Sequence, residues 1–174
     1  QASRLRSMIS RAGGSGHAPG ETVSSSPVSA ISRRSTHVIA VVSGKGGVGK
    51  TLLAANLSIS LSARGYQVVL FDMDMGLANA DIVLGVDAPA TWSDVLGGRR
   101  SWDDVVVAAP GGLSFIPGSS GVSRMANLSD VERRQLLAAM RTVEDRYDVC
   151  VLDCGAGISR NVVKFAASAD TILV

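Results

Sequence analysis

The 174-residue sequence predicts an α/β fold, a mostly parallel sheet flanked by helices, and three observations support this. Several apolar runs are continuous rather than alternating, which indicates strands that are buried on both faces. Segments in which apolar residues recur at helical spacing alternate with these runs along the chain. A glycine-rich turn at residues 43–51 joins the first predicted strand to the first predicted helix.

Five apolar segments are predicted to be strands. The first, residues 37–42, is an uninterrupted β-branched run, and the second, residues 67–72, ends in an acidic residue. Further strands are expected at residues 113–116, 147–153 and 171–174. Because the last of these stops at the final residue of the sequence, we expect the domain to be incomplete at its C-terminal end.

Two helices are expected between the glycine-rich turn and residue 100. After the glycine-rich turn, Leu53, Leu57 and Leu61 recur every four residues, and Gly65 provides a helix stop. A short helix is expected at residues 91–97.

Two more helices are expected nearer the C-terminus. Ser129 and Glu132 have the spacing of a capping box, which predicts a helix that begins there and ends near Arg146. Its core-facing positions are expected to be Leu136, Met140 and Val143. Residues 161–168 are expected to form the last helix.

The first 35 residues differ in character from the rest. Residues 1–11 have the spacing of a short amphipathic helix, and residues 12–35 are rich in glycine, serine and proline, which predicts a flexible linker. The folded domain is therefore expected to span residues 36–174. Residues 1–36 carry a net charge of +4 and the remainder −2, so the domain itself is not expected to bind nucleic acid.

Cellular location is constrained by the apolar runs and the cysteines. No apolar run reaches the length of a membrane span, and no secretory segment is evident. Cys150 and Cys154 would lie roughly 13 Å apart along a strand, too far to form a disulfide. We therefore expect a cytoplasmic protein.

The glycine-rich turn fits the phosphate-binding pattern Gly-x-x-x-x-Gly-Lys-[Ser/Thr]. Glycines let backbone N–H groups approach phosphate oxygens closely, and the following helix offers its positive N-terminus. Lys50 is expected to reach the β- and γ-phosphates and Thr51 to bind Mg²⁺. Lys45 is a second lysine within the loop, and a loop that needs only one positive charge would not require it. A turn that binds nothing is the alternative, and the order strand, loop, helix argues against it.

Three carboxylates follow the predicted strands. Asp72, Asp74 and Asp153 lie at carboxyl ends, where ligands bind in open parallel sheets. Asp153 is expected to orient the water shell of Mg²⁺. Asp72 and Asp74 share one side of the chain, so one could position the attacking water while the other supports the metal shell. Each alone could be an ordinary strand-end carboxylate, but the adjacent loop favours function. For Cys154, a small residue in a turn is the preferred interpretation over an iron–sulfur or redox role.

The loop with Lys45 resembles the deviant Walker A motif of the MinD/ParA ATPases. Residues 71–81 and 151–158 also agree with this family, and the resemblance covers about residues 37–174. Residues 74–85 resemble the flagellar-number regulators of the FlhG/FleN type, as do residues 121–126 and 1–6.

The resemblance implies a site and a cycle. The nucleotide-binding residues would be Gly44, Lys45, Gly46, Gly47, Val48, Gly49, Lys50, Thr51 and Leu52. The family binds ATP with Mg²⁺ and forms a homodimer in which Lys45 of each subunit would reach the partner's phosphates, until hydrolysis resets it. Asp74 matches the water-orienting residue, and Asp153 matches a residue of the Mg²⁺ shell, with Asp72 as a further metal candidate. Leu52 departs from the pattern, since the family usually has a second threonine there.

The resemblance also implies partners and a location. Residues 1–11 resemble a helix that stimulates a GTPase of the signal-recognition-particle type. Membrane binding at the inner face of the cell membrane would require a C-terminal amphipathic helix that this sequence does not include. The predicted function is an ATP-hydrolysing dimerisation switch that regulates flagellar number or placement. The alternatives are a related ATPase that positions division sites, DNA or other cargo, a metabolic ligase or iron–sulfur carrier on the same scaffold, or a module that binds nucleotide without turnover.

Overall fold

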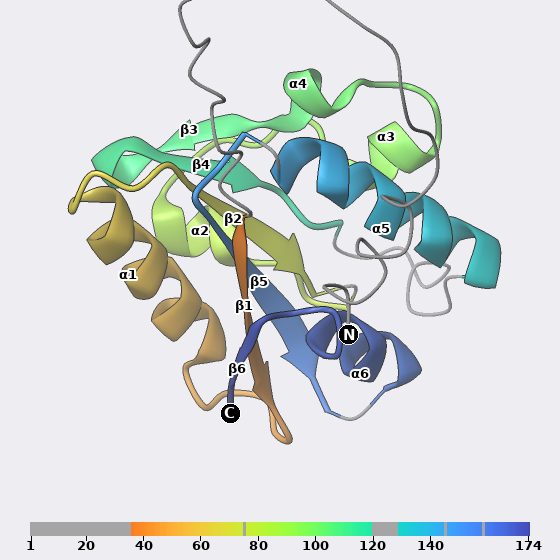
Figure 1. Cartoon of the computed structure of the whole chain (residues 1–174), viewed down its shortest axis with the longest axis horizontal. Coiled ribbons are helices and arrows are strands. Elements are labelled where there is room, and N and C mark those ends of the chain that lie inside the picture. The colour runs from red at the N-terminus through yellow and green to blue at the C-terminus, as the bar shows by residue number, and fades with distance from the viewer. Residues whose placement is uncertain (1–35, 75, 120–128, 145, 158) are drawn as a thin grey trace, which may run out of the picture. The chain divides into compact units, whose positions relative to one another are not determined.

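The computed structural model describes residues 36–174 except for residues 75, 120–128, 145 and 158. Within this part of the chain six strands form one sheet in the order β3-β4-β2-β5-β1-β6 (Figure 1). The strands are β1 (His37–Ser43), β2 (Val68–Met73), β3 (Val107–Ala109), β4 (Leu113–Ile116), β5 (Val149–Ala156) and β6 (Thr171–Leu173). Every neighbouring pair is parallel except β3 and β4, which are antiparallel. The predicted α/β class with a mostly parallel sheet is confirmed.

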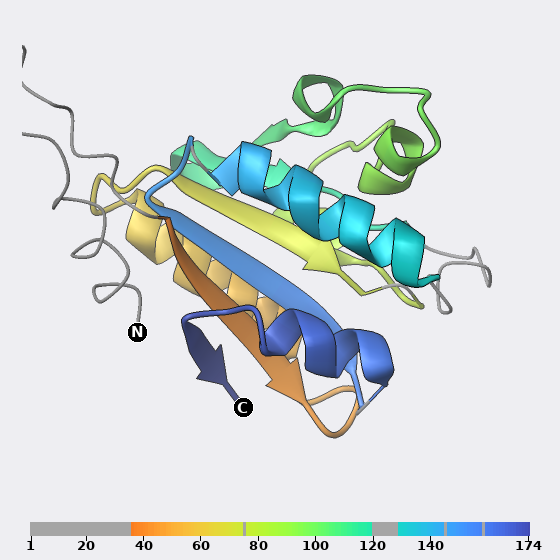
Figure 2. The ribbon, with the colours of Figure 1, turned by 45° about the vertical axis from the view of Figure 1, so that its right-hand side comes forward.

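Helices cover both faces of this sheet. They are α1 (Lys50–Ser62), α2 (Ala80–Leu84), α3 (Trp92–Leu96), α4 (Trp102–Val105), α5 (Asp130–Glu144) and α6 (Arg160–Ala166), with a 3₁₀ turn at Pro110–Gly112. Figure 2 shows α5 and α6 in front of the sheet and α1 behind it. This arrangement follows from parallel pairing, because each parallel connection must cross a face of the sheet.

The strands supply two apolar clusters, one on each face. In β5, Cys150, Leu152 and Cys154 belong to the cluster that includes side chains of α5 and α6, whereas Val149 and Val151 belong to the cluster with α1 and α2. Successive side chains alternate between faces in a strand. Because both faces are covered, both sets are apolar and the strand appears as a continuous run in the sequence.

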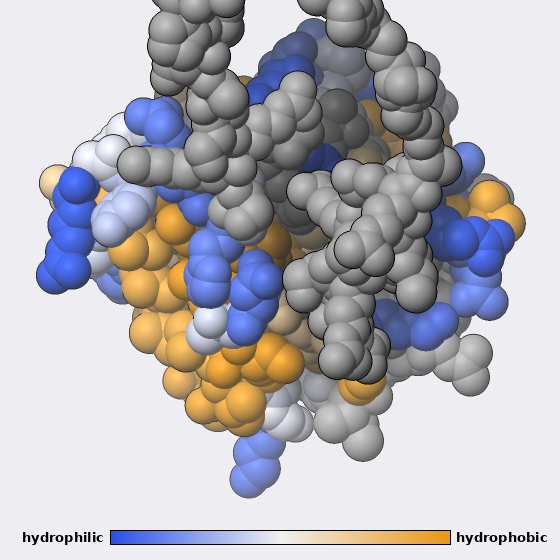
Figure 3. All heavy atoms as spheres, viewed as in Figure 1, coloured by the Kyte–Doolittle hydropathy of each residue, from blue (hydrophilic) through white to orange (hydrophobic). Residues whose placement is uncertain are grey.

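The buried face of α1 is made of small side chains. The helix was predicted correctly, but Ala54, Ala55 and Ser58 are its buried residues, and Leu53 is 51% exposed. Small residues face the sheet because α1 packs closely against several strands and α2. Figure 3 shows the resulting apolar surface over α1.

The predicted capping box at the start of α5 is confirmed. The backbone N–H of Ser129 donates to Glu132 Oε2 at 2.9 Å, and the N–H of Glu132 donates to Ser129 Oγ at 3.2 Å. Leu136 and Met140 are buried as expected, and the side chain of Val143 lies outside the described residues. The elements α2, α4 and β3, which are three to five residues long, were not predicted.

The predicted helix at residues 1–11, the linker at residues 12–35 and the motif at residues 121–126 lie outside the described residues. Among the helices that the structure describes, none has both the length and the apolar character to cross a bilayer.

Candidate functional site

The glycine-rich loop connects the carboxyl end of β1 to the first residue of α1. Gly47 and Gly49 have φ values of 74° and 89°, in the left-handed region where a side chain is unfavourable. A Cβ at Gly44, Gly46, Gly47 or Gly49 would meet no atom within 4 Å, so open space lies around these residues. Gly49 caps α1 without a side-chain hydrogen bond. The N-terminus of this 13-residue helix can therefore offer backbone N–H groups to an anion.

A buried ion pair lies beneath the loop. Lys50 Nζ is 2.6 Å from Asp153 Oδ1, and the two side chains are only 8% and 1% exposed. Asp153 Oδ2 is buried and has no hydrogen-bond partner among the described residues. A buried carboxylate oxygen without a partner is costly, so this atom is a natural position for a ligand.

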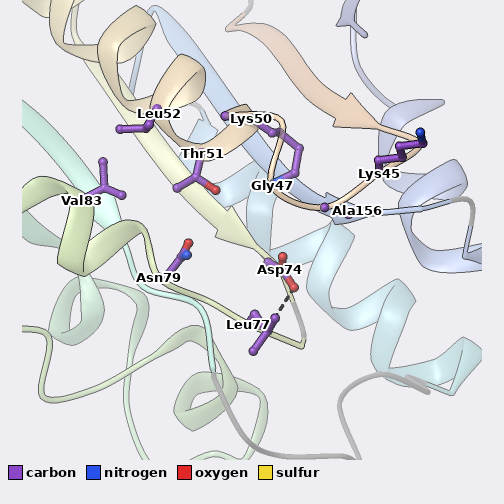
Figure 4. Close-up of a pocket in the computed structure, with 12 residues that line it drawn as sticks. Lys45, Gly47, Lys50, Thr51, Leu52, Asp74, Leu77, Asn79, Val83 and Ala156 are labelled. Carbon is purple, nitrogen blue, oxygen red and sulfur yellow. Dashed lines mark hydrogen bonds between the residues drawn. The ribbon is translucent and has the colours of Figure 1, made fainter.

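Asp74 lies just beyond the end of β2. Its Oδ1 accepts a hydrogen bond from the backbone N–H of Gly76 at 2.9 Å and another from that of Leu77 at 3.0 Å, the second of which is drawn in Figure 4. A Cβ at Gly155 would lie 3.3 Å from Asp74 Oδ1, so the neighbouring strand β5 leaves little spare room around this carboxylate. The backbone thus fixes the direction of the Asp74 side chain.

Asp72 is 1% exposed, and both of its carboxylate oxygens accept backbone hydrogen bonds. Oδ1 accepts from the N–H of Asp74 at 2.9 Å, and Oδ2 accepts from the N–H of Ala80 at 3.2 Å. Burial raises the pKa of Asp72 to about 7, the two hydrogen bonds oppose this change, and the charges of Asp153 and Asp74 add to it.

The loop, Lys50 and Asp74 lie around a cavity of about 400 Å³. Its lining contains the predicted site residues Lys45, Gly46, Gly47, Gly49, Lys50, Thr51, Leu52 and Asp74. Gly44 and Val48 instead line an adjoining cavity of about 440 Å³, together with Lys45, Gly49 and Lys50. Asp72 and Asp153 are buried and line neither cavity, but Asp72 contacts Asp74 and Asp153 contacts Lys50, which both line the first.

Four residues of the first cavity were not predicted, namely Leu77, Asn79, Val83 and Ala156. Asn79 and Val83 belong to α2 or the residue before it, a helix too short to leave a periodic signal. In the sequence, the indication that this stretch belongs to the site is the polar side chain of Asn79, five residues after Asp74.

Lys45 and Lys50 differ in environment. Lys45 is exposed, and Figure 4 shows its side chain directed away from Asp74 and Thr51. The Ser43 hydroxyl donates to the backbone oxygen of Lys45 at 2.8 Å, which fixes the backbone but leaves the ammonium group at the surface. The Lys50 ammonium is thus buried in an ion pair with Asp153, whereas the Lys45 ammonium lies at the surface.

Cys154 follows Asp153 and is 1% exposed. Burial raises the pKa of its thiol to about 12, the Asp153 charge adds to this, and Lys50 opposes it. Since the thiolate is the form that reacts or binds metal, Cys154 is expected to be an inert packing residue at neutral pH.

Known proteins share both this sequence and this fold. A sequence model of an AAA domain matches residues 36–174. Antiactivator FleN of Pseudomonas aeruginosa is 42% identical over 137 residues, which cover 79% of this chain and 49% of that protein. The flagellum site-determining protein YlxH of Helicobacter pylori is 36% identical over 139 residues, covering 80% of this chain and 47% of that protein. The chain thus spans about half the length of these curated relatives.

Among solved structures, the septum site-determining protein MinD of Pyrococcus horikoshii, complexed with Mg-ADP, superimposes with a TM-score of 0.68. It is 31% identical, and the match covers 79% of this chain and 56% of that one. The family model spans most of the sequence, residues 36–174, which include the loop and all three carboxylates. The chain therefore belongs to the AAA-domain family, among its MinD/ParA-type ATPases and close to the FlhG/FleN group.

Proposed function

We propose that this chain binds ATP with Mg²⁺ in the cavity over the glycine-rich loop, hydrolyses it slowly, and acts as a regulatory switch. The observation that carries the proposal is the assembly of Lys50, Thr51 and Asp74 around one cavity, with Lys50 paired to the buried Asp153, whose Oδ2 has no partner among the described residues. The similar Pyrococcus horikoshii protein was solved with Mg-ADP, which supports the choice of ligand.

The residues of the site fit a nucleotide and a metal ion. The backbone N–H groups of the loop and the N-terminus of α1 hold the phosphates, and the Lys50 ammonium offsets their charge. The Thr51 hydroxyl and Asp153 Oδ2 are hard oxygen donors, the kind that Mg²⁺ prefers. When bound, Mg²⁺ supplies positive charge that neutralises the phosphate oxygens as the bond to the leaving group breaks. Asp74, held by two backbone N–H groups, orients the attacking water with its second carboxylate oxygen.

Turnover of ATP by the purified protein tests the catalytic part of this proposal. Phosphate release should require Mg²⁺ and should be lost when Lys50 is replaced. Binding of a fluorescent ATP analogue without any release of phosphate would instead indicate a module that binds nucleotide without turnover.

The switch consists of an ATP-dependent homodimer. Lys45 is exposed at the edge of the cavity and its side chain is directed away from Asp74 and Thr51, so its charge is placed to compensate phosphates bound by a second copy. Lys45→Ala should bind nucleotide nearly as well as wild type but fail to dimerise with a nonhydrolysable triphosphate in sedimentation experiments on the full-length protein. Lys45→Arg should restore dimerisation only partly, because a planar guanidinium differs in shape from a compact ammonium. Lys164→Ala, at an exposed lysine of α6, is the control. A Lys45→Ala dimer that still depends on nucleotide would refute the role in trans.

The biological output is the number or placement of flagella, as the names of the two flagellar relatives suggest. The proposed partner is a GTPase of the signal-recognition-particle type, contacted through residues 1–11, and the protein acts in the cytoplasm or at the inner face of the membrane. Removal of residues 1–35 should leave nucleotide binding intact and abolish stimulation of that GTPase. Equal stimulation by both forms would refute the role of residues 1–11. A full-length protein that does not bind or stimulate that GTPase would favour the alternative of a division-site ATPase, a role that the name of a 34% identical Thermotoga maritima relative suggests.

A further inference from the structure

Asp74, Leu77 and Asn79 line the cavity, and the described residues of the segment from Asp72 to Ala80, all but residue 75, are tied together by one carboxylate. Asp72 Oδ1 accepts the N–H of Asp74, and Asp72 Oδ2 accepts the N–H of Ala80, the first residue of α2. Both hydrogen bonds come from the segment itself, one from near its start and one from its end. Both donors lie next to the cavity: Asp74 itself lines it, and Ala80 directly follows Asn79, which also lines it.

The backbone of Asp72 is held by a second group. Trp92 is fully buried, and its indole Nε1–H donates to the backbone oxygen of Asp72 at 2.9 Å. The backbone N–H of Trp92 in turn donates to the oxygen of Pro117 at 3.2 Å. A buried indole that loses its acceptor is costly, so this contact fixes the end of β2.

A third contact comes from Gly118 in the loop after β4, which packs against the segment. A Cβ at Gly118 would lie 2.7 Å from Ala78 Cβ and 2.9 Å from the oxygen of Asp72. Real Cβ atoms do not approach backbone this closely, so Gly118 and the segment are in tight contact. The segment is therefore held at its start, at its end and in its middle.

We propose that Asp72 is a positioning residue, which holds the segment from Asp74 to Ala80 in the geometry that hydrolysis requires. The proposal rests on the function proposed above for Asp74. It differs from the metal-shell role that the sequence suggested for Asp72, because here the carboxylate acts on the segment rather than on the cation. An aspartate suits this task, since it offers two acceptor oxygens to two donors, whereas an asparagine would oppose one N–H with its own NH₂ group.

Amide hydrogen exchange measured by NMR on the full chain tests the anchoring directly and without any reference to activity. In Asp72→Asn at least one of the two amides, that of Asp74 or that of Ala80, should exchange about tenfold faster or more, because one of the two buried hydrogen bonds cannot be made. The amide of Thr91, which donates to Asp94 Oδ2 outside the segment, should be unaffected. Unchanged exchange at both Asp74 and Ala80 would overturn the proposal.

Steady-state hydrolysis with varied Mg²⁺ separates positioning from metal binding. Asp72→Asn should lower kcat about tenfold to 100-fold, as expected when a catalytic group is displaced by a fraction of an ångström. The affinity for a nonhydrolysable ATP analogue and the Mg²⁺ concentration for half-maximal turnover should stay within about threefold of wild type. Recovery of wild-type kcat at high Mg²⁺ would overturn the proposal in favour of the metal-shell role. Asp81→Asn is the matched control, because Asp81 lies on α2 and its carboxylate Oδ1 accepts the N–H of the adjacent Ile82 at 2.8 Å, outside the contacts that Asp72 makes.

Trp92→Phe provides a second variant should Asp72→Asn fail to fold. It keeps an aromatic ring in the core but removes the donor to Asp72, and should accelerate exchange at Asp74 while lowering kcat. Trp102→Phe is its control, since Trp102 packs against the Phe71 ring at 5.8 Å between centroids. Faster exchange with normal turnover in both test variants would overturn the positioning role while leaving ATP hydrolysis in place. A wild-type protein without ATPase activity would refute the proposed function, and the exchange rates would still decide whether Asp72 anchors the segment.

Discussion

Lys50 is predicted to stabilise the fold as well as to bind phosphate, and the variant Lys50→Met separates the two effects. Its ammonium is the partner of Asp153 at 2.6 Å, and the two side chains are 8% and 1% exposed. Removal of Lys50 would leave Asp153 as a buried charge whose second oxygen already lacks a partner among the described residues.

The expected loss in the free energy of unfolding without nucleotide is about 3–5 kcal/mol, the cost of breaking one side of a buried pair. This is a large part of the roughly 5–15 kcal/mol that stabilises a typical domain. Lys164→Met is the matched control. The Lys164–Asp130 distance is 3.5 Å, and the two side chains are 49% and 66% exposed, so its loss should be no more than about 1 kcal/mol.

Urea unfolding followed by circular dichroism measures both changes. Addition of Asp153→Asn to Lys50→Met should restore most of the lost stability, because the uncompensated charge disappears. ATP with Mg²⁺ at about 100 times the Kd should raise wild-type stability by about 2.7 kcal/mol and should not stabilise Lys50→Met. The reasoning would be refuted if Lys50→Met cost no more than the Lys164 control, or if Asp153→Asn failed to restore stability.

Three further outcomes are expected. Asp74→Ala should keep nucleotide affinity and lower phosphate release by about 100-fold, and normal turnover would exclude a water-orienting role. The free energy of unfolding of apo protein should fall as pH rises. Because the folded-state pKa of Asp72 is raised from 3.8 to about 7, its contribution is complete below pH 4 and lost through pH 7. The fall should be up to about 4 kcal/mol, seen as the difference between wild type and Asp72→Asn in pH-dependent unfolding. Gly49→Ala should destabilise the protein by about 1–2 kcal/mol and weaken binding of an ATP analogue, because Gly49 has φ 89°. Equal melting temperatures would count against this.

The long elements of the fold were predictable because each leaves a periodic or capped signal. The apolar runs of β1, β2 and β5 indicated strands buried on both faces, and the Ser129–Glu132 capping box fixed the start of α5. Short elements were predicted less completely: α3 and β4 were expected, whereas α2, α4 and β3 were missed, because three to five residues hold too few positions to establish a period. The face of α1 was obscured for another reason. Its leucines recur at regular spacing, yet the residues buried against the sheet are the alanines, because α1 packs closely against the strands. The spacing of residues in a sequence does not show how closely two elements approach each other.

The candidate site was predictable to the extent that it depends on one contiguous motif. The loop, its two lysines and Thr51 are adjacent in sequence, so the pattern names them directly. Asp153 is about 100 residues away, and only the parallel sheet, which brings β5 beside β1, places it against Lys50. The principle that ligands bind at carboxyl ends of parallel strands was enough to select it. Asn79 was not predicted, because it directly precedes the short helix α2, whose position depends on packing.

The different roles of Asp72 and Asp74 show where strand periodicity stops being informative. The two residues are separated by one position, and a period of two places them on the same side only while the chain remains extended. The strand β2 ends at Met73, between them. Beyond it the chain turns, so Asp74 accepts N–H groups from the turn while Asp72 accepts the N–H of Asp74 itself. The first carboxylate is buried to shape the turn, and the second lines the cavity because the turn has that shape. A sequence shows two equivalent acids, and only the path of the backbone after Met73 makes one of them the support of the other.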